Sequence, residues 1–355
     1  MKTLIIGPSW VGDMMMSQSL YRTLKQQNSN INIDVMAPSW SGGLLTKMPE
    51  VDAVIDMPIG HGKLALAERY RIGKSLAIKG YDSAFILPNS FKSALIPFFA
   101  HIPKRTGWLG ELRYGLLNDY RRLNKAAFPL MVERYIALAF NAHSVSCADE
   151  IPKPLLWPRL TVNPSEVSNT ITEFGLKAAL PLIGFCPGAE FGPAKRWPSY
   201  HYAELADMLI RQGSRVLILG SNNDQLIGQD IKNRVQYGEY CTNLAGKTSL
   251  EQAISLLAAC NGIVTNDSGL MHIAAALNKP LVALYGPSSP DFTPPLSKCA
   301  EIIRLVTGYK KIRKGKIDLG YHQGLIDIHP DVVFETLMNL LDRCQRHGNT
   351  GMAYG

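Results

Sequence analysis

One acidic residue and one pair of basic residues have the types and the placement needed for chemistry, since each follows a short apolar run. Asp13 lies in GPSWVGDMMM, after the apolar residues 3–6, and Lys195 and Arg196 lie in CPGAEFGPAKRWP, after residues 182–186. A carboxylate can take a proton from a hydroxyl group, and paired cations can bind a diphosphate. The two stretches therefore indicate transfer chemistry on a phosphate-bearing substrate.

The basic stretch has further features of an anion site. Pro187, Gly188 and Ala189 would leave the backbone N–H groups uncovered, and a helix is expected to begin near Pro198, a favoured first-turn residue. Backbone N–H groups, a helix N-terminus and the cations Lys195 and Arg196 would then meet at one place. The alternative is a surface loop whose basic residues are only solvated.

A second loop, TNDSGLMHIAAAL at residues 265–277, also follows an apolar run. Asp267 and Ser268 can cap the following helix, Gly269 permits the close approach of a ligand, and His272 lies one turn further on. An N-cap alone would also explain the Asp and Ser. We expect Asp267 to hold Lys195 or another positioned group rather than to face a phosphate.

Asp13 itself has two interpretations. As a general base it would accept a proton from an incoming hydroxyl group, while Lys195 and Arg196 stabilise the departing diphosphate without a metal. Attack from the side opposite the leaving group would invert the sugar carbon. As a structural residue, Asp13 would cap a helix beginning at Met14, and the two roles could coexist.

Polar and basic residues in the first half could bind a phosphorylated acceptor. They lie in LPNSFKSALIPFF and KRTGWLGELRYG, and they are Asn89, Ser90, Lys92, Lys104, Arg105, Trp108 and Arg113. A solvated positive face is the alternative. The basic run YKKIRKGK at residues 309–316 could contact anionic lipid headgroups or be a charged loop.

Alternating apolar runs and amphipathic stretches must position these residues. Strands are expected at residues 3–6, 33–37, 53–57, 83–87, 182–186, 215–219, 262–265, 281–284 and 302–305. Helices are expected at residues 15–26, 64–79, 93–100, 200–212, 224–235, 250–260, 270–277 and 331–344. Buried strands separated by helices indicate an α/β protein with doubly wound parallel sheets. Ligands would bind at the carboxyl ends of these strands, in a cleft shared by two domains.

The domain boundary is expected in a proline-rich stretch around residues 152–164. We predict an N-terminal domain of residues 1–160 and a C-terminal domain of residues 161–328. A helix at 329–345 and a flexible tail at 346–355 would follow.

Composition limits the classes of protein that this chain can be. Its 355 residues suit two domains, and 46% hydrophobic residues describe a globular protein. A net charge of +8 favours acidic partners such as a nucleotide-activated substrate or an anionic membrane surface. Six scattered cysteines, an N-terminus unlike a signal peptide and no long apolar run lead us to expect a cytoplasmic protein.

Several common motifs are missing from the sequence. No GxGxxG follows an apolar run and no GxxxxGK[ST] occurs, which disfavours a dehydrogenase and a P-loop ATPase. Neither Asp-x-Asp nor HExxH is present, so we expect no catalytic metal and no cofactor.

Five segments carry a resemblance to a known family. GPSWVGDMMMSQSLYRTL, LPNSFKSALIPFF, CPGAEFGPAKRWP, TNDSGLMHIAAALNKPLVALYGPSSPDFTPPL and GYHQGLIDI resemble the ADP-heptose heptosyltransferases of glycosyltransferase family 9, over residues 1 to about 345. The resemblance implies a GT-B fold of two Rossmann-like domains facing across a central cleft, with the C-terminal helix crossing back to the first domain.

The activity that this resemblance implies is inverting, metal-independent transfer of L-glycero-D-manno-heptose from ADP-heptose. The implied acceptor is the first heptose of the lipopolysaccharide inner core on Kdo₂-lipid A. The enzyme would contact the cytoplasmic face of the inner membrane peripherally, and no nucleic acid polymer is implied as a partner.

The resemblance also assigns residues to roles. It places the catalytic base at Asp13 and the diphosphate-binding lysine at Lys195. The donor-contacting residues would be Gly12, Gly188, Ala189, Lys195, Arg196, Asp267, Ser268, Gly269 and His272. The acceptor-binding choices Asn89, Lys92 and Arg105 depend on position and charge more than on a motif.

Three other functions stay open at this point. A family member could instead act on Kdo₂-lipid A that lacks heptose, because it would share the donor and the fold. A nucleotide-sugar epimerase would need acid and base groups but no acceptor site, which the basic and aromatic residues near Arg105 disfavour. A non-catalytic sugar-nucleotide or lipopolysaccharide-binding protein would have no need of Asp13 as a base.

Overall fold

The computed structural model describes residues 1–350 except 61, 177–179, 191, 309–311, 313–314 and 316–319. The basic run 309–316, apart from Ile312 and Gly315, and the end of the expected tail at 351–355 lie outside the described residues. The chain forms two compact units: unit 1 is Met1–Leu160 with Asp291–Thr293, and unit 2 is Thr161–Pro290 with Pro294–Gly355.

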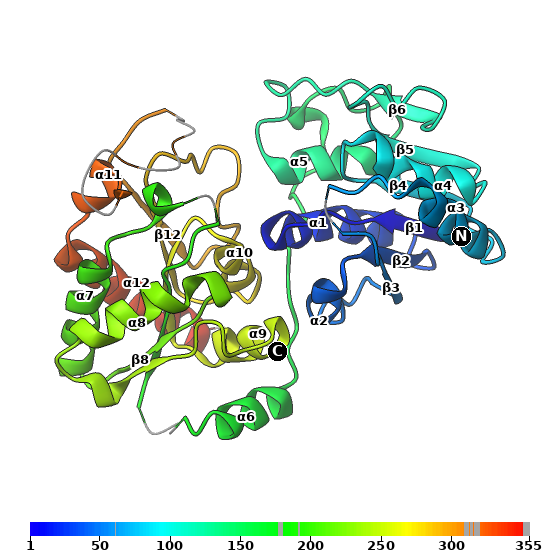
Figure 1. Ribbon diagram of the computed structural model, residues 1–355. Helices are drawn as coiled ribbons and strands as arrows, with labels where there is room; N and C mark the ends of the chain where they lie inside the picture. The colour runs from blue at the N-terminus through cyan, green and yellow to red at the C-terminus, as the bar shows by residue number, and fades with distance from the viewer. Residues whose placement is uncertain are drawn as a thin grey trace. The chain divides into compact units, whose positions relative to one another are not determined.

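Unit 1 contains a six-stranded sheet in the order β3-β2-β1-β4-β5-β6, and every neighbouring pair is parallel (Figure 1). Its strands are β1 Lys2–Ile6, β2 Asn32–Ala37, β3 Ala53–Asp56, β4 Ser83–Ile86, β5 Lys104–Trp108 and β6 Asp119–Arg121. Its helices are α1 Val11–Gln27, α2 Gly42–Leu45, α3 Leu66–Ala77, α4 Leu95–Phe99 and α5 Met131–Ile136. Short 3₁₀ turns are η1 Ser39–Ser41, η2 Phe91–Ala94, η3 Ala137–Ala139 and η4 Ala148–Glu150.

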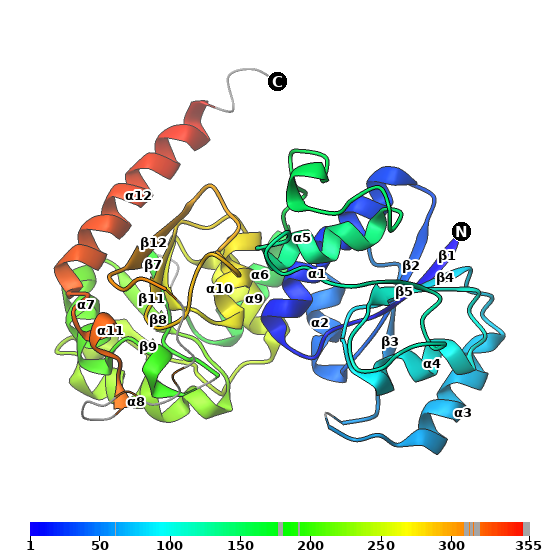
Figure 2. The same ribbon diagram turned by 90° about the horizontal axis from the view of Figure 1, so that it is seen from above.

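Unit 2, most of whose strands are labelled in Figure 2, contains a second parallel six-stranded sheet. Its strand order is β12-β11-β10-β7-β8-β9. Its strands are β7 Leu182–Cys186, β8 Arg215–Ile218, β9 Cys241–Asn243, β10 Gly262–Asn266, β11 Leu281–Tyr285 and β12 Ala300–Arg304. Its helices are α6 Pro164–Glu173, α7 Ser199–Arg211, α8 Gln225–Arg234, α9 Leu250–Ala259, α10 Gly269–Ala276, α11 Gln323–Ile326 and α12 Pro330–Thr350. Short 3₁₀ turns are η5 Pro193–Lys195, η6 Asn222–Asp224 and η7 Gly238–Tyr240.

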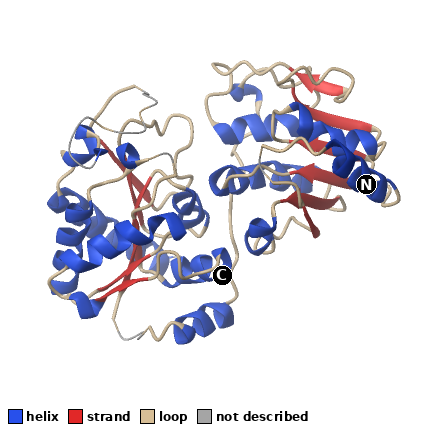
Figure 3. Cartoon of the chain, viewed as in Figure 1, coloured by secondary structure: helices blue, strands red, loops and turns tan. Residues whose placement is uncertain are grey.

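Helices lie on both faces of each sheet, which explains why the central strands are buried and mostly apolar (Figure 3). In unit 1 the residues of β4 are all buried, and in unit 2 those of β10 and β11 are all buried. Each unit has its own core cluster, one around Leu4, Ile86 and Leu117 and the other around Phe185, Trp197 and Leu284. The expected α/β class with doubly wound parallel sheets is confirmed.

Each sheet has one point where the strand order reverses direction. This point lies between β1 and β4 in unit 1 and between β7 and β10 in unit 2. In open α/β sheets, ligands bind outside the carboxyl ends of the two strands that flank such a point. The loops after β1, β4, β7 and β10 are therefore the positions at which functional residues are expected.

All nine expected strands are present, with ends shifted by at most two residues. The sequence reading missed β5, β6 and β9, which are short or carry polar residues. It also missed α6 in the proline-rich stretch, where Asn163 accepts a hydrogen bond from the Ser165 N–H and Pro164 occupies the first helical position. The boundary between the units at Leu160 and Thr161 immediately precedes this helix.

The C-terminal helix α12 contacts α7, β10, β11 and β12, all of them in unit 2. It runs to Thr350, so residues 346–350 are helical where the sequence suggested a flexible tail. Each added residue only extends an existing helix, which costs much less than starting one. The predicted crossing to the N-terminal domain stays a prediction. No helix within the described part of the chain is long and apolar enough to span a membrane.

Candidate functional site

Asp13 lies in the first turn of α1, in the loop-to-helix segment that follows β1. The Gly7 N–H donates to the Met36 carbonyl at 2.9 Å, and a Cβ at Gly7 would lie 3.3 Å from that carbonyl oxygen. Glycine thus lets the chain pass close to β2 before it turns into α1. The helix begins two residues before Asp13, with Trp10 at the N-cap position. The structural interpretation of Asp13 as the cap of a helix starting at Met14 is therefore wrong.

The environment of Asp13 favours its neutral form. Burial raises the pKa of its carboxyl group from 3.8 to about 6. Its charge also helps to raise the pKa of the buried Tyr135 on α5, a helix that packs against α1. Among the described residues its carboxylate accepts no hydrogen bond and forms no ion pair. A carboxyl group with a pKa close to neutral and free oxygen atoms can act as a proton acceptor.

The loop after β4 carries Asn89 and Lys92 beside the reversal point of unit 1. Asn89 is exposed and Lys92 is half-buried in η2. Since β4 pairs directly with β1, the loop that contains these residues leaves the sheet next to the segment that contains Asp13. The topology thus brings the two acceptor candidates to the expected edge of the sheet.

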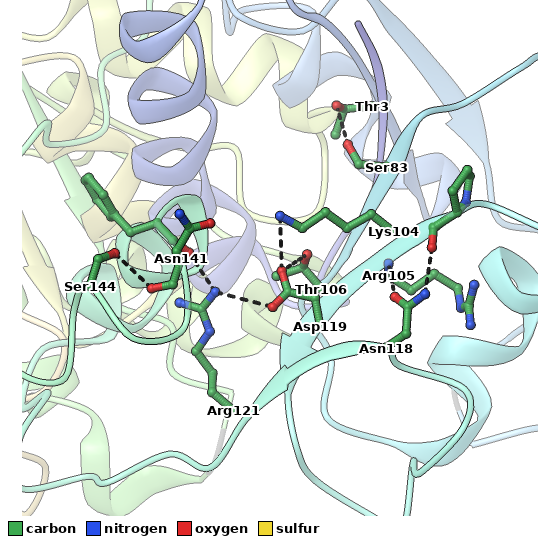
Figure 4. Close-up of polar contacts among 12 residues, drawn as sticks. Thr3, Ser83, Lys104, Arg105, Thr106, Asn118, Asp119, Arg121, Asn141 and Ser144 are labelled. Carbon is green, nitrogen blue, oxygen red and sulfur yellow. Dashed lines mark hydrogen bonds and ion pairs between the residues drawn. The ribbon is translucent and has the colours of Figure 1, made fainter.

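The side chain of Arg105 on β5 donates hydrogen bonds to backbone carbonyls of unit 1. Its Nε donates to the Leu116 carbonyl at 2.6 Å and its Nη1 to the Ile102 carbonyl at 2.6 Å. Figure 4 shows it beside Asn118, whose Oδ1 accepts from the Arg105 N–H at 2.8 Å. These bonds tie β5 to neighbouring loops, and the acceptor role of Arg105 stays a prediction.

Arg113 and Trp108 of the same basic and aromatic stretch are structural, contrary to both sequence interpretations. Arg113 is fully buried, and Trp108 is buried with its Nε1 donating to the Arg134 carbonyl at 2.9 Å. Lys104 forms an ion pair with Asp119 at 3.3 Å (Figure 4). Arg113 and Trp108 therefore form neither a solvated face nor an exposed acceptor site.

Lys195 and Asp267 meet at the reversal point of unit 2. Lys195 ends η5 in the loop after β7, and Asp267 directly follows β10. The Lys195 Nζ donates to Asp267 Oδ2 at 2.7 Å. This is the pairing that the sequence suggested, and it fixes a cation at the carboxyl edge of the sheet.

A residue that the sequence reading missed holds the same two loops together. The Oδ1 atom of Asn266 accepts from the Trp197 N–H at 3.0 Å, and its Nδ2 donates to the Pro187 carbonyl at 2.7 Å. Asn266 is fully buried. Its amide therefore fixes the start and the end of the basic loop against β10. A polar residue at the end of an apolar run was the only sequence signal for it.

Ser268, Gly269 and His272 continue from Asp267 into α10. Ser268 is the N-cap residue but makes no side-chain capping bond, so capping does not account for its hydroxyl group. Burial lowers the pKa of His272 to about 4. The charge of Lys195 also lowers this pKa, whereas the charge of Asp267 opposes the shift. His272 is thus a neutral imidazole at physiological pH.

Arg196 is paired with Asp224, a second residue that the sequence reading missed. The Arg196 Nη2 lies 3.3 Å from Asp224 Oδ1, and Asp224 Oδ2 accepts from the Ser221 N–H at 2.9 Å. A Cβ at Gly188 would lie 2.4 Å from the Asp224 carboxylate. The loop after β8 therefore packs directly on Gly188, and a side chain at this position would displace the Asp224 carboxylate.

Ala189 and Gly12 are the remaining residues that were predicted to contact the donor. Ala189 is buried, and its carbonyl accepts from Arg196 Nη2 at 3.5 Å. Gly12 lies in the first turn of α1 beside Asp13. The described residues contain no cluster of three or more His, Cys, Asp or Glu side chains that could hold a metal ion.

Comparison with known proteins identifies the family. The model of glycosyltransferase family 9 (heptosyltransferase) matches residues 69–322. The chain belongs to this family. It is 62% identical to lipopolysaccharide heptosyltransferase 2 of Salmonella typhimurium, over 96% of this chain and 99% of that protein. Lipopolysaccharide heptosyltransferase 1 of Escherichia coli is 24% identical over 96% of this chain.

A solved structure agrees with this assignment. The E. coli ADP-heptose lipopolysaccharide heptosyltransferase II has a TM-score of 0.91 and 58% identity, and the match covers 97% of this chain and 100% of that one. The chain is therefore a glycosyltransferase with the GT-B fold, as the sequence resemblance implied.

Proposed function

We propose that this glycosyltransferase transfers L-glycero-D-manno-heptose from ADP-heptose to the first heptose of the lipopolysaccharide inner core, with inversion at the anomeric carbon. The observation that carries the proposal is the 62% identity with a lipopolysaccharide heptosyltransferase 2 along nearly the whole of both chains. The chemistry of the two reversal points supports it, because one has a carboxylate suited to proton transfer and the other a fixed cation.

In the proposed reaction the acceptor hydroxyl oxygen forms a bond to the anomeric carbon of heptose. The bond from that carbon to the diphosphate oxygen breaks, and ADP leaves with the electron pair. Asp13 takes the proton of the hydroxyl group, for which its raised pKa of about 6 is suitable. A single displacement of this kind gives an inverted product.

Lys195 has the proposed role of stabilising the negative charge that develops on the departing diphosphate. Its ion pair with Asp267 holds the ammonium group in place before the donor binds, so little reorganisation is needed during the reaction. Gly188 and Ala189 would offer backbone close to the phosphates, and Ser268, Gly269 and the neutral His272 would line the same end of α10. Because Lys195 supplies the positive charge, the proposed transfer needs no metal.

Arg196 and Gly12 complete the proposed donor contacts. Arg196 would move from Asp224 to the diphosphate or bind it while paired, and Gly12 would allow the sugar to approach α1. On the acceptor side, the proposal assigns Asn89, Lys92 and Arg105 to the inner-core saccharide. Arg105 has the weakest structural support, because two of its donor atoms already bind backbone carbonyls.

Acceptor identity is the point on which the alternative differs. A heptosyltransferase 1 would use Kdo₂-lipid A without heptose, but the chain shares only 24% identity with that enzyme of E. coli. The test is transfer from ADP-heptose to Kdo₂-lipid A with and without its first heptose, each with and without EDTA. We expect product only from the heptose-bearing acceptor and no effect of EDTA.

Product from the acceptor that lacks heptose would assign the alternative activity. Loss of transfer on EDTA treatment, restored by Mg²⁺, would contradict the metal-independent mechanism. Donor binding without transfer to either acceptor would favour the non-catalytic binding protein.

We also propose peripheral contact with the cytoplasmic face of the inner membrane, supported by the net charge of +8 and the lipid-anchored acceptor. Association with anionic liposomes should fall as salt screens these charges. Binding that is insensitive to salt would contradict an electrostatic attachment.

A further inference from the structure

Arg113 is a fully buried arginine that lies beneath the loop after β4. Its Nη1 donates to the Pro88 carbonyl at 2.7 Å and to Ser93 Oγ at 3.2 Å. Its Nη2 donates to Asn89 Oδ1 at 3.3 Å and also to the Trp108 carbonyl. One guanidinium group thus contacts both ends of the segment 88–93.

The neighbours of Arg113 in the chain hold the same segment from a second side. Glu111 Oε2 accepts from the Phe91 N–H at 2.9 Å, and the Glu111 N–H donates to the Asn89 carbonyl at 3.2 Å. A Cβ at Gly110 would lie 2.2 Å from the Asn89 carbonyl oxygen, so the two loops touch backbone to backbone. The loop 109–113 therefore acts as a clamp on the loop 88–93.

Burying the charged guanidinium group of Arg113 costs free energy of folding, which a purely stabilising role would not explain. Burial lowers the pKa of Arg113 to about 10 while the charge of Glu111 opposes the shift, so the side chain stays charged at neutral pH. The hydrogen-bond acceptors around it are neutral carbonyl, amide and hydroxyl oxygens, and its Nε has no hydrogen-bond partner among the described residues. Buried ion pairs can often be replaced by apolar side chains without loss of stability, so the burial of a charge is not by itself a way to stabilise a loop. A rigid planar fork, in contrast, fixes several loop atoms at once.

The clamped loop is also the one that the topology places beside Asp13. It follows β4, and β4 pairs with β1 at the reversal point of the sheet. Asn89 receives a bond from Arg113 on its side-chain oxygen, which sets the orientation of its amide group. Lys92 lies between Phe91 and Ser93, both of which the clamp contacts.

We propose that Arg113 is a positioning residue for the acceptor: it fixes the loop 88–93 so that Asn89 and Lys92 are presented beside the catalytic carboxylate. This inference rests on the proposed function. Arg113 contacts no substrate, and its effect on transfer passes through Asn89 and the loop backbone.

The first test is steady-state transfer by Arg113→Met and Arg113→Lys. Loss of the bonds to the loop should raise the acceptor KM by about tenfold in Arg113→Met. The Lys variant should recover part of this loss, because one ammonium group can reach only some of the acceptor atoms. The donor KM and ADP affinity should be unchanged, because Arg113 bonds to none of the residues proposed to contact the donor.

Arg69→Met is the matched control. Arg69 is also a buried arginine of unit 1, and it donates to the Leu64 carbonyl at 2.6 Å and the Lys63 carbonyl at 3.2 Å, not to the loop 88–93. It should lose thermal stability as Arg113→Met does but keep the acceptor KM of the wild type. An equal rise in acceptor KM in this control would show a general effect of destabilisation and overturn the proposal.

Asn89→Ala, alone and combined with Arg113→Met, separates positioning from stability. If Arg113 acts through Asn89, the Asn89 substitution should raise the acceptor KM much less in the Arg113→Met protein than in the wild type. Fully additive effects would contradict the proposal. A wild type that transfers to neither acceptor would instead contradict the proposed function.

Glu111→Ala keeps the proposal testable if Arg113→Met does not fold. Glu111 is exposed, so its replacement leaves the core intact, yet it removes the bond to the Phe91 N–H. It should raise the acceptor KM in the same direction by a smaller factor. An unchanged acceptor KM in both Glu111→Ala and Arg113→Lys would overturn the proposal.

Discussion

The sheets of unit 1 and unit 2 have equivalent strand orders, with the reversal between the first and the fourth strand of each. The loops that flank this point differ in their charges. Unit 2 has the ion pair of Lys195 and Asp267, with a distance of 2.7 Å. Unit 1 has Asp13, whose carboxylate has no ion-pair partner among the described residues.

This difference suggests how one topology can serve two halves of a reaction. A paired cation keeps its charge and its position, which suits the binding of an anion. An unpaired and buried carboxyl group has a raised pKa and can exchange a proton near neutral pH. We therefore expect unit 1 to carry the proton chemistry and unit 2 the binding of the diphosphate.

The two units also fix their loops with different side chains. In unit 2 the amide of Asn266, at the end of β10, bonds to both ends of the loop after β7. In unit 1 the guanidinium of Arg113, which comes from the loop after β5, bonds to both ends of the loop after β4. In both units the residue comes from the neighbouring strand or the loop that follows it, since β10 pairs with β7 and β5 pairs with β4. Asn266 is itself the last residue of β10, so a short amide reaches the loop, whereas Arg113 lies beyond the end of β5 and uses a longer side chain.

The largest effect is expected from Asp13→Asn. Removal of a general base should lower kcat by about 10³-fold, within the usual range of 10²–10⁴ for such catalysis. The affinity for ADP should be that of the wild type, because Asn keeps the shape of the side chain and the residues proposed to bind the diphosphate lie in unit 2. Initial rates at saturating donor, together with ADP titration calorimetry, measure both quantities. Activity within a few fold of the wild type would remove Asp13 from the chemistry.

A smaller effect, on a different quantity, is expected from Lys195→Ala. Loss of a charge-assisted hydrogen bond to phosphate should weaken ADP binding by about 10- to 100-fold. The now unpaired Asp267 would repel the diphosphate, so Asp267→Asn in the same chain should restore part of the affinity. Lys232→Ala, on α8 of the same unit, is the control for loss of one positive charge. Equal ADP affinity in Lys195→Ala and Lys232→Ala would contradict the assignment of diphosphate binding to Lys195 of unit 2.

The smallest effect concerns stability. The pKa of Asp13 is about 6 in the folded protein, and the ordinary value of an aspartate, 3.8, applies to the unfolded chain. The folded state therefore binds more protons between these values, and the free energy of unfolding falls as the pH rises from about 4 to 6. Asp13→Asn should lack this loss of stability and be more stable than the wild type by on the order of 3 kcal/mol at pH 8.

Urea unfolding of both proteins at pH 4 and at pH 8 measures this difference, which should shrink toward the lower pH. Equal stability of the two proteins at pH 8 would mean that the carboxylate carries no burial penalty.

Much of the fold could be predicted from the sequence because buried parallel strands are continuous apolar runs. Residues 182–186 and 281–284 are of this kind, and both are strands. The strands β6 and β9 have three residues each and include Asp119, Arg121 and Asn243, so local patterning does not reveal them. Their strand conformation depends on pairing with β5 and β8.

The candidate site could be predicted in part. Glycine, proline and charged residues after apolar runs indicated the loops of Asp13, Lys195 and Asp267, and the structure brings Lys195 and Asp267 together. Arg113 was misread as a surface cation, because charge in a sequence does not reveal burial. Asp224 was missed because its contact with Gly188 joins loops that are 36 positions apart in the chain.

The pH dependence of kcat tests the central claim most directly, since ADP-heptose is a diphosphate diester that does not titrate near neutral pH. The wild type should be measured at saturating donor and acceptor between pH 5 and pH 8. The account predicts that kcat falls about tenfold per pH unit below an apparent pKa of about 6, as Asp13 becomes protonated, and is level above it. A kcat that is constant from pH 5 to pH 8 would contradict Asp13 as the base.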